Sequence, residues 1–121
     1  MKITHDNDKP TASVELPLTR PLGDYDIEDV DKPTPRDVDE VLVSQGFLDL
    51  VDDARAALAA LLGEHGLEVV QLTGAICKGD AVFRPGLWLV LREPGASGAM
   101  SAEARNRVAT VAEALRALLN L

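Results

Sequence analysis

Residues 67–92 read LEVVQLTGAICKGDAVFRPGLWLVLR, and this stretch decides the fold. It is the part of the chain rich enough in Val, Ile, Leu, Phe and Trp to build a sheet. Lys78-Gly79-Asp80 and Pro85-Gly86 are turn signals within it. We therefore expect an antiparallel meander of three strands, over residues 67–77, 81–84 and 87–92.

The last of these strands is apolar on both faces, because side chains alternate between the two faces of a strand. Leu87, Leu89 and Leu91 share one face, and Trp88, Val90 and Arg92 share the other. Helices are expected to cover one face, and the N-terminal segment or a second copy of the chain to cover the other. Trp88 is interpreted first as a core residue beneath a helix, because tryptophan is usually well buried, and second as an interface residue.

Helical patterns lie on both sides of this stretch. A helix is predicted to begin at Pro35 with Thr34 as its N-cap. Residues 44–46 interrupt the pattern, so a second helix is predicted from Phe47 to about Leu62, where apolar residues recur at i, i+3 and i+4.

Small residues and capping residues indicate how these helices pack and where they begin and end. Ala56, Ala59 and Ala60 widen the apolar face of the second helix, which would let another backbone come close. Gly66 is a C-terminal stop for it. Ser101 is expected to cap a final helix, in which Glu103 and Arg107 form an ion pair at i, i+4.

The N-terminal third differs in composition, since residues 1–35 hold five of the seven prolines. Proline excludes a long helix and confines a strand to a sheet edge. The sequence therefore predicts an extended, proline-rich acidic arm over residues 1–33, in which the alternation of Ala12–Leu18 indicates a half-buried edge strand. Residues 34–121 are predicted to form a single α+β domain, with a small antiparallel sheet of three to five strands and two main helices packed on one face.

Charge narrows the classes of partner. The 121 residues carry a formal net charge of −8, which argues against nucleic acid and anionic membranes as partners. The opening residues MKITHDNDKP contain no apolar run, so neither a signal peptide nor a membrane anchor is expected. We expect cytoplasmic residence.

Residue types that carry chemistry are scarce. The single cysteine, Cys77, is expected to be a small buried hydrophobe. Two histidines, His5 and His65, are too few for a structural zinc site. An acidic run from Asp24 resembles the start of a calcium loop but has Asp29 where that loop needs glycine. We therefore predict no catalytic residues, no metal site, no cofactor and no enzyme activity.

Acidic residues are the remaining signal. The predicted function is a non-catalytic protein–protein interaction module, such as an adaptor, inhibitor or assembly component, that acts through an acidic surface and the arm on a protein partner with a basic surface. Its predicted contact residues are Asp24, Asp26, Glu28, Asp29, Asp31, Asp49, Asp52, Asp53 and Trp88. From the sequence, deletion of residues 1–33 is expected to abolish partner binding and to leave the fold intact.

Two alternatives stay open. The acids from Asp24 to Asp53 are also typical of a nucleic-acid mimic that inhibits a DNA- or RNA-binding protein. The predicted strand over residues 87–92 is apolar on both faces, which is also typical of a homodimer. The second alternative is therefore a dimeric chaperone-like protein for an exported or assembling partner.

Overall fold

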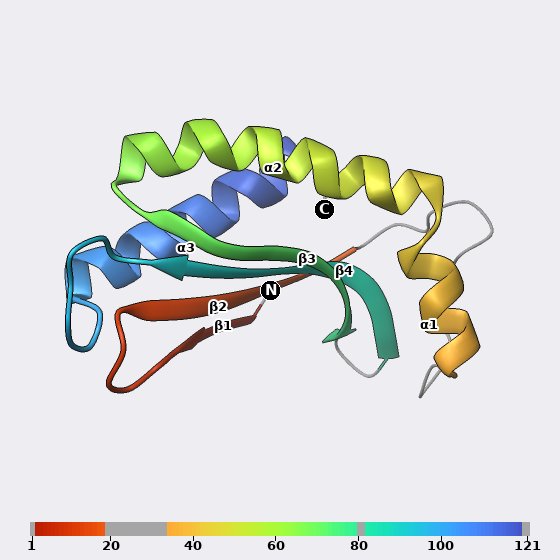
Figure 1. Cartoon of the computed structure of the whole chain (residues 1–121), viewed down its shortest axis with the longest axis horizontal. Helices are drawn as coiled ribbons and strands as arrows, with labels where there is room; N and C mark the ends of the chain where they lie inside the picture. Colours follow the sequence, from red (N-terminus) through yellow and green to blue (C-terminus); the bar gives the residue numbers. More distant parts are fainter. Residues whose placement is uncertain (1, 19–33, 80–81, 120–121) are drawn as a thin grey trace.

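The computed structural model of the protein describes residues 2–18, 34–79 and 82–119, and within these ranges it is an α+β fold (Figure 1). Its elements are, in chain order, β1 (Lys2–His5), β2 (Thr11–Pro17), α1 (Pro35–Leu42), α2 (Gln45–His65), β3 (Glu68–Gly79), β4 (Val82–Arg92) and α3 (Ala102–Leu118). The four strands form one antiparallel sheet in the order β1-β2-β4-β3. The predicted fold class, a small antiparallel sheet with helices, is therefore confirmed.

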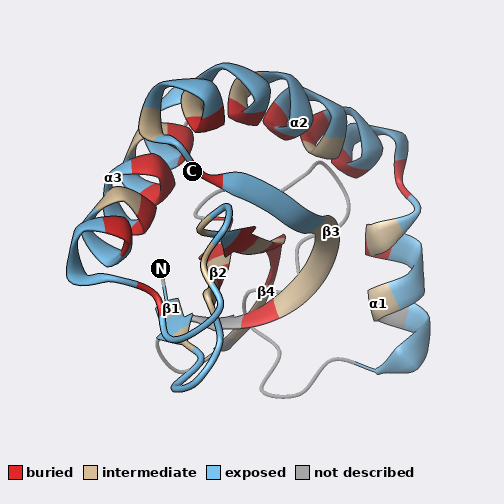
Figure 2. Cartoon of the chain, turned by 60° about the vertical axis from the view of Figure 1, so that its left-hand side comes forward, coloured by how far each residue is buried: buried red, intermediate tan, exposed pale blue. Residues whose placement is uncertain are grey.

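Helices α2 and α3 pack side by side on one face of this sheet (Figure 1). The buried face of the sheet carries Leu87, Leu89 and Leu91 of β4, which are at most 1% exposed. Figure 2 shows the buried residues of both helices turned towards the sheet. The helix residues that join these leucines in one core cluster are Ala54, Leu58 and Leu62 of α2 and Ala104, Val108, Val111, Ala112 and Leu115 of α3.

Strand β2 lies inside the sheet, between β1 and β4. Its residues Ala12, Val14 and Leu16 are at most 1% exposed and belong to the core. The prediction that Ala12–Leu18 forms a strand is confirmed, but its placement at a sheet edge is wrong. Pro17 does not prevent this position because it is the last residue of the strand. Residues 2–18 are thus part of the same sheet as β3 and β4, whereas the rest of the predicted arm, residues 19–33, lies outside the described residues.

Strands β3 and β4 form one long hairpin, so the predicted three-stranded meander is wrong. Pro85-Gly86 is the cause, because it looks like a turn but lies within β4, where both residues are buried. The carbonyl oxygen of Pro85 accepts a hydrogen bond from the amide of Leu18 at 2.9 Å. A Cβ on Gly86 would lie 2.5 Å from the carbonyl oxygen of Leu16. Glycine is therefore needed here for the close approach of β2 to β4.

The helix ends follow the local signals. Ser44 caps α2, its hydroxyl accepting a hydrogen bond from the amide of Phe47 at 3.3 Å. Gly66 ends α2 with φ of 64°, in the left-handed region that glycine favours. Ser101 caps α3 through the amide of Ala104 at 3.1 Å, as predicted. The predicted ion pair in α3, Glu103 with Arg107, is also present at 2.5 Å.

Candidate functional site

The predicted acidic contacts divide into two groups. Asp49, Asp52 and Asp53 are exposed on α2. Asp49 accepts a hydrogen bond from the side-chain amide of Gln45 at 2.8 Å, and Asp52 pairs with Arg55 at 3.4 Å. The other predicted acids, Asp24, Asp26, Glu28, Asp29 and Asp31, lie outside the described residues. The three described acids therefore form an acidic face in the N-terminal half of α2.

Trp88 lies on the other side of the sheet from this acidic face. It alternates along β4 with Leu87 and Leu89, which pack against the helices, so its side chain points to the opposite face. Its register partners are Glu15 in β2 and Thr73 in β3, and it is half-buried. The interpretation of Trp88 as a core residue beneath a helix is wrong. Trp88 and the acids of α2 do not form one surface.

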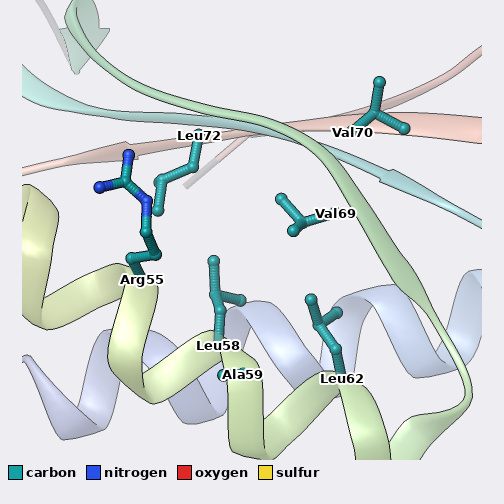
Figure 3. A pocket seen from close by; sticks show the side chains of 7 residues that line it. All are labelled: Arg55, Leu58, Ala59, Leu62, Val69, Val70 and Leu72. Carbon is teal, nitrogen blue, oxygen red and sulfur yellow. The ribbon is translucent and has the colours of Figure 1, made fainter.

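A groove of about 250 Å³ lies between α2 and the start of β3 (Figure 3). In Figure 3 the side chains of Val69 and Leu72 point towards α2, and Arg55 extends from α2 towards Leu72. Arg55 is the one charged residue among those that line the groove. These residues are Arg55, Leu58, Ala59 and Leu62 from α2 and Val69, Val70 and Leu72 from β3.

A β-bulge leaves the β3 side of this groove open to solvent. Val69 pairs with Leu91 and Gln71 pairs with Val90, so Val70 is the additional residue of the bulge. Val69 is 44% exposed and Val70 is 56% exposed. Two adjacent valines that both face solvent are unusual on a sheet with one covered face, where one of each pair is normally buried. The groove is thus an exposed apolar surface.

The same strand forms one edge of the sheet, since β4 is its neighbour on one side only among the described strands. Natural sheets usually protect a long edge with charged residues. β3 has twelve residues, and residues 69–77 contain no charged side chain. The opposite edge, β1, has four residues with Lys2 exposed at its start. The β3 edge is therefore the one suited to pairing with a further strand.

Sequence reasoning missed the groove. Leu58, Leu62 and Leu72 follow ordinary core patterns, and the exposure of Val69 and Val70 follows from the sheet order and the bulge. The alanines of α2 gave a partial signal. Ala56, Ala59 and Ala60 are exposed rather than part of the core face, and Ala59 lines the groove.

The titratable groups of the described residues do not converge on the groove. The Cys77 side chain is 2% exposed, as predicted for a buried hydrophobe, and lies on the backbone of Gly86. Burial raises the pKa of the Cys77 thiol to about 11, and the Glu15 carboxylate adds to the rise. Burial and the nearby Arg105 lower the pKa of His5, whose Nδ1 atom is enclosed in the protein.

The native Cys77 thiol is expected to be almost inert. Because its pKa is about 11, the thiolate fraction near pH 8 should be about 100-fold below that of an ordinary cysteine, and the reaction with a disulfide reagent should slow by at least that factor. Labelling with Ellman's reagent, in buffer and in concentrated urea, measures this ratio. A Val70→Cys, Cys77→Ala variant should react rapidly in buffer, since residue 70 is exposed. Equal rates for wild type in buffer and in urea would contradict the burial of Cys77.

Within residues 2–18, 34–79 and 82–119, no three His, Cys, Asp or Glu side chains gather closely enough to hold a metal ion. Over the same ranges, each helix is too short or too polar to cross a membrane. No protein-family model, curated protein or solved structure matches the chain.

Proposed function

We propose that the chain is a non-catalytic protein–protein interaction module whose docking surface is the groove between α2 and β3 together with the edge of β3. The exposure of Val69 and Val70 beside an edge that no other described strand pairs with is the observation that carries the proposal. An extended segment of another polypeptide would add a strand to β3 through backbone hydrogen bonds. Its alternate side chains would contact the accessible lining residues Ala59, Val69 and Leu72.

The acidic face of α2 is a second contact surface in this proposal, separate from the groove. Asp49, Asp52 and Asp53 are exposed and would attract a partner with a basic surface. Contacts of this kind weaken as salt screens them, whereas contacts in the apolar groove do not. The predicted contribution of Asp24, Asp26, Glu28, Asp29 and Asp31 belongs to the same proposal.

Site-specific photo-crosslinking tests the docking surface directly. A benzophenone amino acid at position 70 should yield crosslinks to a polypeptide in cells that express the chain, because Val70 borders the groove and is 56% exposed. Position 43 is the matched control, since Val43 is 70% exposed but lies between α1 and α2, away from the groove. Crosslinks from position 43 and none from position 70 would contradict the proposed docking surface.

A further inference from the structure

We propose that the polypeptide bound at the groove and edge is a second copy of this chain, so that the protein is a twofold dimer built by antiparallel pairing of β3 with β3. This inference rests on the proposed docking surface and names its occupant. The two sheets would join into one of eight strands, with both α2 helices on the same face and next to each other across the twofold axis.

The lack of charged residues along the groove and edge favours a second copy of the chain over a basic partner. The chain carries −8, yet residues 69–77 of the edge have no charge and residues 54–63 of α2 have Arg55 alone. A basic partner would be matched by acids around the groove, whereas an uncharged surface is matched by another uncharged surface. Asp52 lies next to the groove but is paired there with Arg55 at 3.4 Å, and Asp53, Glu64 and Glu68 lie outside these two runs. These two runs thus form a nearly uncharged surface that a second acidic copy can approach.

The proposed contact is also self-complementary. A twofold interface places the same patch on both subunits, and two antiparallel edge strands satisfy this condition. In the dimer the exposed Val69 and Val70 of each copy would meet the groove region of the other. A single added strand would leave the neighbouring surface of α2 uncovered. A second copy would cover it as well, because small residues at an exposed stripe allow two helices to approach within about 8 Å. Ala59 of this stripe lines the groove, and Ala56 and Gly63 are exposed about one turn before and after it.

The opposite sheet edge limits assembly to two copies. After β3 pairs with β3, the outer strands of the joined sheet, among the described strands, are β1 and its copy. β1 has four residues, with Lys2 and Thr4 exposed, and a short, charged edge resists further pairing. The assembly therefore closes as a dimer and does not grow into a fibre.

Sedimentation equilibrium of the full chain tests the inference. The mass of wild type should rise from 12.9 kDa towards twice that value between about 1 µM and about 200 µM chain. Val70→Lys should weaken the dimer at least about tenfold, because it places like charges on both edges of the pair. Val43→Lys is the matched control and should leave the dissociation constant unchanged, since Val43 is exposed away from the groove.

Salt provides an independent readout. Two acidic copies repel each other, so added salt should tighten the dimer, whereas it would weaken an ion-paired complex with a basic partner. A monomeric mass at about 200 µM would overturn the inference, as would a dimer that Val70→Lys leaves unchanged. A monomer whose position 70 crosslinks to a different protein would overturn the second copy and support the docking surface. A monomer without crosslinks from position 70 would overturn both.

Discussion

Deletion of residues 2–18 is expected to abolish cooperative folding of the chain, which corrects the expectation from the sequence that deletion of residues 1–33 leaves the fold intact. The deletion removes β2, which pairs with β4 over seven register positions from Thr11↔Arg92 to Pro17↔Gly86. It also removes the buried side chains of Val14, Leu16 and Leu18. Burial of a side chain of this size contributes about 1.5–3 kcal/mol, so the loss is comparable with a total stability of about 5–15 kcal/mol.

Thermal unfolding followed by circular dichroism measures this effect. The truncated chain should show no cooperative transition, because Leu89 and Leu91 would lose their neighbours in β2. Deletion of residues 2–9 is the control, since it removes β1 and leaves β2 in place. That control should melt cooperatively at a lower temperature. A cooperative, wild-type melting curve for the longer deletion would contradict the central position of β2.

Phe47→Ala is expected to cost about 3–5 kcal/mol of unfolding free energy, the usual range for removal of a buried phenylalanine. Phe47 is 1% exposed and joins Val41 of α1, Leu50 of α2 and Leu18 in a second core cluster. Its ring packs on Gly74 in β3, where a Cβ would overlap the ring. The substitution would therefore leave a cavity between two helices and the sheet.

A double-mutant cycle sharpens this prediction. Gly74→Ala should destabilise wild type because the new methyl group overlaps the ring of Phe47. The same substitution should be tolerated in the Phe47→Ala background, where the space is empty, so the two effects should not add. Leu48→Ala is the control, since Leu48 is next in sequence but 45% exposed. Urea unfolding measures all four variants. Additive effects of Phe47→Ala and Gly74→Ala would contradict the contact.

Local signals predicted the helices well. Ser101, Gly66 and the interruption at residues 44–46 act through hydrogen bonds within a few residues, so the sequence pattern alone locates them. The strands depend on distant partners. Pro85-Gly86 looks like a turn because its role in β4 is visible only once β2 lies against it. For the same reason, alternation predicted the strand over Ala12–Leu18 but not its place in the sheet.

The candidate site was harder to predict than the fold. An exposed apolar groove is a property of sheet order, since Val69 and Val70 would be ordinary core residues if another strand lay beside β3. The high acidic content of the chain led to a prediction of mostly acidic contact residues. Of these, Asp49, Asp52 and Asp53 are exposed on α2, apart from Trp88 on the other side of the sheet. The absence of charge over residues 69–77 was the more informative pattern.

Amide hydrogen exchange along β3 tests the central claim, that this edge pairs with the same edge of a second copy of the chain. The comparison is between dilute and concentrated protein, with the β2–β4 ladder as an internal reference. We expect the amides of residues 69–73 to become more protected as the concentration rises, while those of Val14 and Leu89 stay equally protected throughout. Exchange over residues 69–73 that does not depend on concentration would contradict the pairing of this edge with a second copy.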